Sequence, residues 1–209
     1  MACKSGFDRK PMQEISLQSL KLRDLDIVYV FVLGDPGTGK TTLIDYIMTR
    51  RISDHLLPSF QYVSESDRMT DIGMVTLRLL ELNREQLYLP EISQVCRAEK
   101  HVFLFVYAFD DCSSFSFLYM TWILNVRKVF GRTVNTFMLG NKLDLKTDHY
   151  FKIKNPNYSD ALSLTYKNIF NVDWASECCA LTGYQVDSVF CEIAKLGIET
   201  RTFLIRRTF

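Results

Sequence analysis

One segment of the chain has the residue types and spacing that suit the binding of phosphate groups. Residues 34–41 read Gly-Asp-Pro-Gly-Thr-Gly-Lys-Thr and follow the apolar run 27–33. Glycines let a backbone take positive φ, so that several N–H groups and the N-terminus of a following helix converge on one anion. The apolar spacing after Lys40 predicts such a helix. The segment therefore matches the strand, glycine-rich loop and helix pattern of a phosphate-binding loop.

Two side chains of this loop have separate expected roles. Lys40 is a mobile point charge that reaches the β and γ phosphates, and it is the candidate catalytic residue. The Thr41 hydroxyl is expected to ligate a Mg²⁺ ion that bridges two phosphates. The candidate nucleotide-binding residues of the segment are Asp35, Pro36, Gly37, Thr38, Gly39, Lys40, Thr41 and Thr42.

A second motif, Asn141-Lys142-Leu143-Asp144, directly follows the apolar run 134–140. Ligands in an open parallel sheet lie at the carboxyl ends of the strands, so this motif and the phosphate loop are expected at one edge. The Asp144 carboxylate offers two acceptors to the two donors of guanine, a pair that adenine lacks. Alone, the tetrapeptide favours a turn or a helix cap; behind a phosphate loop and after another strand it predicts a guanine site.

The apolar periodicity predicts alternating strands and helices after residue 26. The strand candidates are 27–33, about 60–66, 74–81, 102–109, 134–140 and 172–178. The helix candidates are 41–50, roughly 86–98, 113–129, 159–169 and 184–197. Two strands are apolar almost throughout, which is typical of strands covered on both faces, whereas the strands before and after the turn 70–73 alternate. The predicted fold class is α/β: a P-loop NTPase with a mostly parallel six-stranded sheet, one antiparallel edge pair and helices on both faces.

Length and composition fit one domain with short additions. The 209 residues divide into an N-terminal extension over 1–26, a nucleotide-binding domain over 27–199 and a C-terminal tail over 200–209. Lys and Arg number 25 against 24 Asp and Glu, a balance that gives no argument for nucleic acid binding. The six cysteines form no C-x-x-C pair, and no apolar run is long enough to span a bilayer. These features predict reduced thiols and a cytoplasmic protein.

On these residues the chain resembles the Ras superfamily of small GTPases, and within it the Rab branch, from about Ile27 to Gly197. The resemblance implies that GTP or GDP and Mg²⁺ are bound. Cys179-Ala180-Leu181 stands where the family carries Ser-Ala-Lys, which adds these three residues to the candidate guanine site and places the Ala180 N–H at the guanine carbonyl. Effectors or complex-forming proteins are expected on the switch face of a monomer. The tail carries no cysteine for a direct lipid anchor, so partners would recruit the protein to membranes or to a transport complex.

The two switch segments depart from the family pattern. Ser59 falls at the switch I distance from Thr41 and keeps a hydroxyl for Mg²⁺, although an ordinary loop Pro-Ser is the alternative. Glu81 stands where the family has aspartate and is the third candidate metal residue. Arg84 replaces a glycine and Glu85 replaces the glutamine that orients the attacking water. These changes predict slow hydrolysis, and the alternative role of Arg84 is that of an internal arginine finger.

The combined expectation is a guanine-nucleotide-binding, Rab-like protein with weak or impaired GTP hydrolysis, acting as a regulatory switch or adaptor in intracellular trafficking. One alternative is a pseudo-GTPase that serves as a constitutive protein-interaction scaffold. A small-molecule P-loop kinase is a further alternative, which the guanine motif and the lack of an arginine-rich lid disfavour. The aromatic cluster is interpreted as packing rather than as a ligand site; its members are Phe115, Phe117, Tyr119, Trp122 and Phe130.

Overall fold

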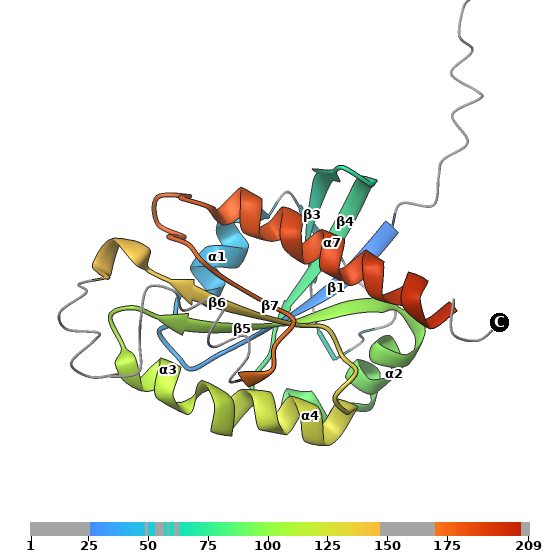
Figure 1. The fold of residues 1–209 in the computed structure, drawn as a ribbon, viewed down its shortest axis with the longest axis horizontal. Coiled ribbons are helices and arrows are strands. Elements are labelled where there is room, and N and C mark those ends of the chain that lie inside the picture. Colours follow the sequence, from blue (N-terminus) through green and yellow to red (C-terminus); the bar gives the residue numbers. More distant parts are fainter. Residues whose placement is uncertain are drawn as a thin grey trace, which may run out of the picture.

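The computed structural model describes residues 26–48, 50–52, 57, 59–60, 63–146 and 170–205, with the backbone alone for residues 50, 52 and 200–205. These residues form a seven-stranded sheet in the order β2-β3-β4-β1-β5-β6-β7 (Figure 1). The strands are β1 Asp26–Leu33, β2 Arg50–Ile52, β3 Val63–Thr70, β4 Gly73–Glu81, β5 Lys100–Ala108, β6 Thr136–Asn141 and β7 Trp174–Glu177. The predicted helix 159–169 and most of the predicted N-terminal extension lie outside the described residues.

The pairing of the strands confirms the predicted fold class. β1 pairs in parallel with β4 and β5, and β6 pairs in parallel with β5 and β7. The predicted antiparallel pair is β3 and β4, joined at a turn where the Thr70 hydroxyl donates to the Gly73 carbonyl oxygen over 2.8 Å. The three-residue β2 adds a second antiparallel pair at the same edge, on β3. Parallel β1, β5 and β6 therefore end at one edge of the sheet.

Helices cover both faces of the sheet (Figure 1). The helices are α1 Lys40–Ile47, α2 Pro90–Ala98, α3 Cys112–Leu118, α4 Leu124–Phe130 and α7 Val186–Ile205. Residues of β1 alternate between the two cores, because successive side chains of a strand point to opposite faces. Val28, Val30 and Val32 pack with α1 and α7, whereas Tyr29 and Phe31 pack with α2, α3 and α4.

Four predicted helices differ in detail from those observed. The predicted helix 41–50 ends at Ile47, before β2, and the predicted helix 86–98 is divided into the 3₁₀ turn Gln86–Tyr88 and α2. The predicted helix 113–129 appears as α3 and α4 joined by a π-helical segment, Tyr119–Ile123. A π-helical turn is wider than an α-helical turn and shifts the direction of the side chains that follow. The last helix begins at Val186 and continues to Ile205, past the predicted domain boundary at residue 199, because the sequence from Gly197 to Ile205 contains no proline to stop it. The division into three segments stays a prediction.

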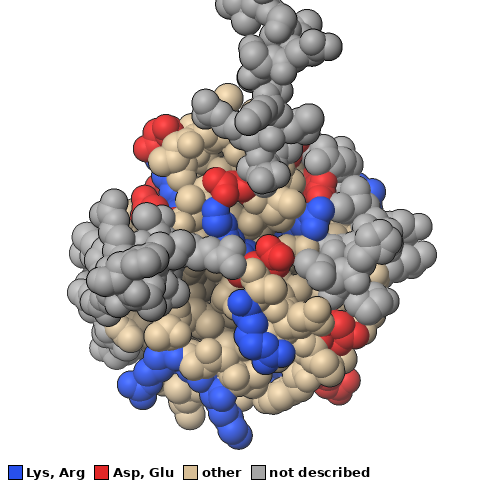
Figure 2. All heavy atoms as spheres, turned by 90° about the vertical axis from the view of Figure 1, so that its right-hand side faces the viewer, with Lys and Arg blue, Asp and Glu red and all other residues tan. Residues whose placement is uncertain are grey.

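The surface charge and the helix composition bear on the sequence predictions about nucleic acid and a membrane. On the face drawn in Figure 2, both acidic and basic side chains are spread over the described residues. No helix in the described ranges combines the length and the apolar character that crossing a membrane requires.

Candidate functional site

The phosphate loop lies between the end of β1 and the first turn of α1, as the sequence predicts. Gly37 and Gly39 have φ of 82° and 84°, a left-handed backbone that glycine adopts without strain. The loop is closed by the Asp35 carbonyl oxygen, which accepts the Thr38 hydroxyl over 3.0 Å and the Lys40 Nζ over 2.9 Å. The Lys40 side chain therefore lies across a loop that is already shaped. Pro36 at the tip and Thr42 on α1 are exposed.

Glu81 connects the phosphate loop to the neighbouring strand. It is opposite Val32 in the parallel register of β1 and β4, which brings the end of β4 beside the loop. The Thr41 hydroxyl donates to Glu81 Oε2 over 2.7 Å, and Lys40 Nζ lies 3.5 Å from Glu81 Oε1. Two predicted metal residues are thus brought together. A hydroxyl and a carboxylate are oxygen ligands of the kind that Mg²⁺ prefers, so the donor set fits that ion.

Ser59, the remaining predicted metal residue, makes a different contact. Its hydroxyl donates to Glu91 Oε1 at the start of α2 over 2.6 Å. This hydrogen bond holds the pKa of the Glu91 carboxyl below its usual value. The structure therefore joins Ser59 to α2 rather than to Thr41 and Glu81, and its role as a metal ligand stays a prediction.

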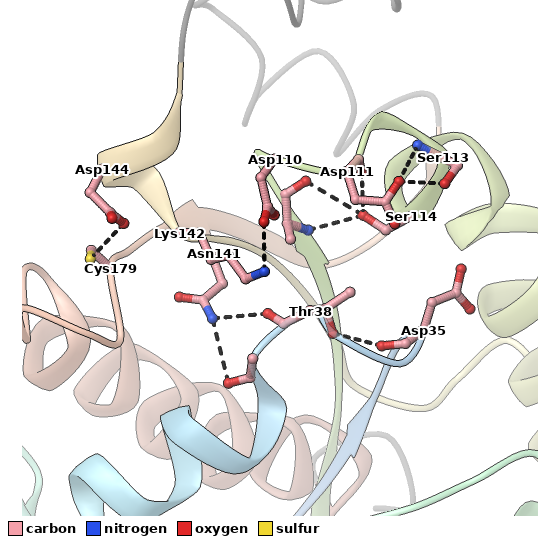
Figure 3. Close-up of polar contacts among 12 residues, drawn as sticks. Asp35, Thr38, Asp110, Asp111, Ser113, Ser114, Asn141, Lys142, Asp144 and Cys179 are labelled. Atoms are coloured by element: carbon pink, nitrogen blue, oxygen red, sulfur yellow. Dashed lines mark hydrogen bonds and ion pairs between the residues drawn. The ribbon is translucent and has the colours of Figure 1, made fainter.

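Asn141 joins the two predicted nucleotide-binding loops. It ends β6 and is almost completely buried, with 1% of its surface exposed. Its Nδ2 donates to the carbonyl oxygens of Thr38 over 3.0 Å and Gly39 over 3.5 Å (Figure 3). Its Oδ1 accepts the Ala180 N–H over 3.0 Å. One side chain therefore holds the phosphate loop, the end of β6 and the segment after β7 at the same edge of the sheet.

The other residues of the guanine motif surround Asn141. Lys142 takes a left-handed conformation with φ of 59°, and its Nζ forms an ion pair with Asp110 Oδ2 over 2.8 Å. Asp144 is exposed at its tip and accepts the Cys179 thiol over 2.9 Å (Figure 3). The predicted guanine residues of β6 and of the segment after β7 are thus in contact. Leu181 is the exception, because 79% of its surface is exposed and the structure gives it no polar contact to the motif.

The segment after β4 forms one wall of a cavity beside Lys40. The cavity has a volume of about 600 Å³ and is lined by the phosphate loop, by Glu81, Arg84 and Gln86, and by Trp122. Asn83 and Gln86 bind each other reciprocally: each side-chain oxygen accepts the backbone N–H of the other residue over 2.9 Å. The two hydrogen bonds close the turn that leads from β4 into the 3₁₀ turn Gln86–Tyr88. They fix the turn that carries the exposed Arg84 and Glu85.

Trp122 is a site residue that the sequence interpretation missed. It belongs to the buried core with 4% of its surface exposed, which confirms packing as one of its roles. Its indole N–H also donates to Asp35 Oδ1 in the phosphate loop over 2.9 Å. A buried tryptophan N–H usually has a polar partner, so the sequence could have suggested that Trp122 forms a hydrogen bond. The partner lies 87 residues away, so the sequence did not indicate which residue it is.

The sheet, the phosphate loop and the loop after β6 define a P-loop nucleotide-binding protein. The sequence model of the Ras family matches residues 29–198, which is most of the chain. The chain belongs to the Ras family, whose members are small proteins that bind GTP and GDP, typically with Mg²⁺, and interact with effectors and regulators. Comparison with curated proteins gave no match.

Proposed function

We propose that this protein is a Rab-like member of the family that holds a guanine nucleotide but hydrolyses GTP slowly, and that it acts as a switch or adaptor in intracellular trafficking. The observation that carries the proposal is the pair of contacts made by Asn141, to Thr38 and to Ala180. They support the proposal because they join the phosphate loop, the end of β6 and the segment after β7. The segment that would activate water carries Arg84 and Glu85 instead of the family residues.

The guanine preference is attributed to Asp144. Asp144 is exposed, and one oxygen of its carboxylate accepts the Cys179 thiol over 2.9 Å. A carboxylate accepts from the guanine N1–H and exocyclic amine together, whereas adenine would leave it with no matching pair. The Ala180 N–H donates to Asn141 Oδ1 over 3.0 Å, so its predicted contact with the guanine carbonyl would compete with this hydrogen bond.

The phosphates and the metal ion are attributed to the other half of the site. Lys40 Nζ and the loop N–H groups would bind the phosphate oxygens. Thr41 Oγ1 and Glu81 Oε2 are 2.7 Å apart and would hold Mg²⁺. The bound ion would screen the charge of the phosphates. Lys40 already contacts Asp35 and Glu81. Its side chain would therefore lose little further conformational entropy when a nucleotide binds.

Slow hydrolysis is attributed to the two altered positions after β4. Glu85 brings a carboxylate, which repels the phosphate charge by about 1 kcal/mol in water at close range. It also lacks the amide that both donates to and accepts from an attacking water. Losing one positioned catalytic group typically costs about a hundredfold in rate. Family members hydrolyse GTP slowly even with that group present.

Nucleotide binding tests the core of the proposal. Fluorescent GDP and a GTP analogue should bind in the presence of Mg²⁺ and be displaced by unlabelled GTP, and ATP at the same concentration should not compete. The Lys40→Ala variant should bind far more weakly, whereas Lys128→Ala, on α4 and outside the site, should bind as the wild type does. Equal competition by ATP would show that the site does not select guanine.

A single-turnover assay tests the rate of hydrolysis. The wild-type chain loaded with GTP should release phosphate slowly, and the Glu85→Gln variant, which restores the amide, should release it faster. A wild-type rate that Glu85→Gln lowers would contradict the assignment of slow turnover to this residue.

A partner assay separates the switch from a constitutive scaffold. Proteins captured from a lysate with the GTP-analogue form should differ from those captured with the GDP form. Equal capture by both forms would favour the scaffold. The proposed working place is the cytoplasm, with recruitment to membranes or to a transport complex by partners, and cell fractionation with and without a captured partner would test it.

A further inference from the structure

We propose that Arg84 recognises the terminal phosphate of a bound guanosine triphosphate, and that Trp122 is the positioning residue that holds Arg84 at the phosphate loop. The inference rests on the proposed function, since it concerns the same nucleotide. It assigns to a side chain the discrimination between the triphosphate and the diphosphate.

Arg84 and Trp122 form a wall of the cavity next to Lys40. The Arg84 guanidinium carbon lies 5.9 Å from the centroid of the Trp122 ring, within the range of a cation–π contact. Among the residues that the structure describes, no carboxylate forms an ion pair with Arg84, whose observed contact is with Trp122. Its charge is therefore held against an aromatic face and remains available to an anion in the cavity. Both side chains line the same space as Lys40 and Asp35.

The geometry also shows which phosphate would reach Arg84. Thr38 and Gly39 are on the side of the loop that contacts Asn141, where the base is expected. Asp35 and Pro36 are on the other side, where they line the cavity with Arg84, and the residues of the guanine motif do not line it. A nucleotide whose base lies at Asp144 therefore runs past Lys40 toward Arg84. The phosphate farthest from the base would meet the guanidinium.

Trp122 connects this wall to the phosphate loop. Its indole N–H donates to Asp35 Oδ1, and the carbonyl oxygen of the same Asp35 accepts Lys40 Nζ. Figure 3 shows the Asp35 carboxylate pointing away from Thr38, so the contact with Trp122 also directs this negative charge away from the loop interior. The π-helical segment that contains Trp122 changes the direction of the helix side chains, which explains why an aromatic residue of the core reaches the loop.

Arginine suits the recognition of a phosphate beside an aromatic ring better than lysine would. Its planar fork makes two parallel hydrogen bonds to phosphate oxygens and also stacks on aromatic rings. The reciprocal contacts of Asn83 and Gln86 fix the turn, so that only the Arg84 side chain has to move. Because a bound phosphate is recognised before any bond changes, the effect should be on affinity for the triphosphate rather than on the rate of hydrolysis.

Equilibrium binding of a non-hydrolysable GTP analogue and of GDP, each with Mg²⁺, tests the inference. Arg84→Gln should weaken binding of the analogue about tenfold or more, because it removes a charge-assisted contact. Binding of GDP should change by less than about twofold, as for an ordinary surface substitution. Arg84→Lys should fall between, and Arg97→Gln, an exposed arginine on α2 outside the cavity, should leave both affinities unchanged. Trp122→Phe, which keeps a ring but removes the N–H, should weaken the analogue more than GDP.

A fluorescence measurement gives an independent readout. The chain contains two tryptophans, and Trp174 is exposed on β7 outside the cavity. In a Trp174→Phe chain, Trp122 emission should change with the analogue, change less with GDP, and lose this difference when Arg84→Gln is added. If Arg84→Gln weakens both nucleotides equally or neither, the inference is wrong while the proposed function stands. A wild-type chain that binds no guanine nucleotide contradicts both.

Discussion

The Asn141 amide nitrogen lies 3.0 Å from the Thr38 carbonyl oxygen, although the two residues are 103 positions apart in the sequence. This hydrogen bond ties the loop that would hold the phosphates to the loop that would recognise the base. The buried amide also accepts the Ala180 N–H, which adds the third segment of the site. A nucleotide that contacts all three segments meets them already in place, so little binding energy is spent on ordering them.

Replacing Asn141 by aspartate should therefore destabilise both the fold and the site. Asn141→Asp keeps the acceptor for Ala180 but removes the donor to Thr38 and Gly39, and it leaves carbonyl oxygens facing a carboxylate. We expect a loss of about 2–3 kcal/mol in the free energy of unfolding, the cost of an unpaired buried polar group. Urea denaturation measures it. Asn125→Asp, on the α4 side of the molecule, is the matched control and should cost less; equal losses would argue against the special role of Asn141.

Two glycines of the phosphate loop allow the cost of backbone strain to be separated from the cost of a steric clash. Gly37 and Gly39 have nearly the same left-handed φ, so alanine at either position should cost about 1–2 kcal/mol in backbone energy. A Cβ on Gly37 would meet no atom within 4 Å, whereas one on Gly39 would lie 2.5 Å from Asn141 Nδ2. Thermal unfolding of Gly39→Ala should therefore show the larger loss, together with weaker guanine nucleotide binding. Equal unfolding temperatures for Gly37→Ala and Gly39→Ala would mean that the Asn141 side chain can move away from the added Cβ without loss of stability.

The buried thiol beside Asn141 predicts a dependence of stability on alkaline pH. Burial raises the pKa of the Cys178 thiol from 9.0 to about 12. The native chain therefore keeps a proton that the unfolded chain releases above pH 9, so the contribution of this thiol is fully present below pH 9 and is lost as pH rises toward 12. Urea unfolding between about pH 8 and about pH 10.5 should show a smaller fall in stability for Cys178→Ala than for wild type. Cys191→Ala, at a partly exposed position, should keep the wild-type slope, and an unchanged slope in Cys178→Ala would contradict the assignment.

The parts of the fold that the sequence predicts are those set by local patterns. The phosphate loop and the guanine motif each follow an apolar strand, and strands of a parallel sheet end at one edge, so their meeting at Asn141 was predictable. The contact of Trp122 with Asp35 was not, because it depends on a π-helical turn that apolar periodicity does not reveal. The contact of Ser59 with Glu91 was not predicted either, because an exposed serine hydroxyl can bond to any polar group that the fold brings near it.

The contact between Thr41 and Glu81 predicts how the metal ion should affect nucleotide binding. Glu81→Gln keeps an oxygen for the Thr41 hydroxyl but removes the charge that would favour Mg²⁺. In wild type, chelation of Mg²⁺ should accelerate GDP release strongly, and in Glu81→Gln release should already be fast and respond little to chelation. Stopped-flow release of fluorescent GDP measures both. Glu91→Gln is the control, because it removes the charge of a carboxylate that contacts Ser59 instead of Thr41. If it reproduces the effect of Glu81→Gln, the metal site includes Ser59.

Asp144→Asn should change which purine the site accepts without disturbing the fold. The amide oxygen can still accept the Cys179 thiol, so the unfolding temperature should stay close to that of wild type. Guanine would lose the carboxylate that accepts its two N–H donors, and its affinity should fall about a hundredfold or more. Xanthine carries a carbonyl oxygen where guanine has the amine, so its affinity should rise because the new amide can donate to that oxygen. Competition between labelled GDP and xanthosine diphosphate measures the change, with Asp45→Asn on α1 as the control of the same chemistry outside the site. Unchanged affinities for both nucleotides in Asp144→Asn would mean that this carboxylate does not contact the base.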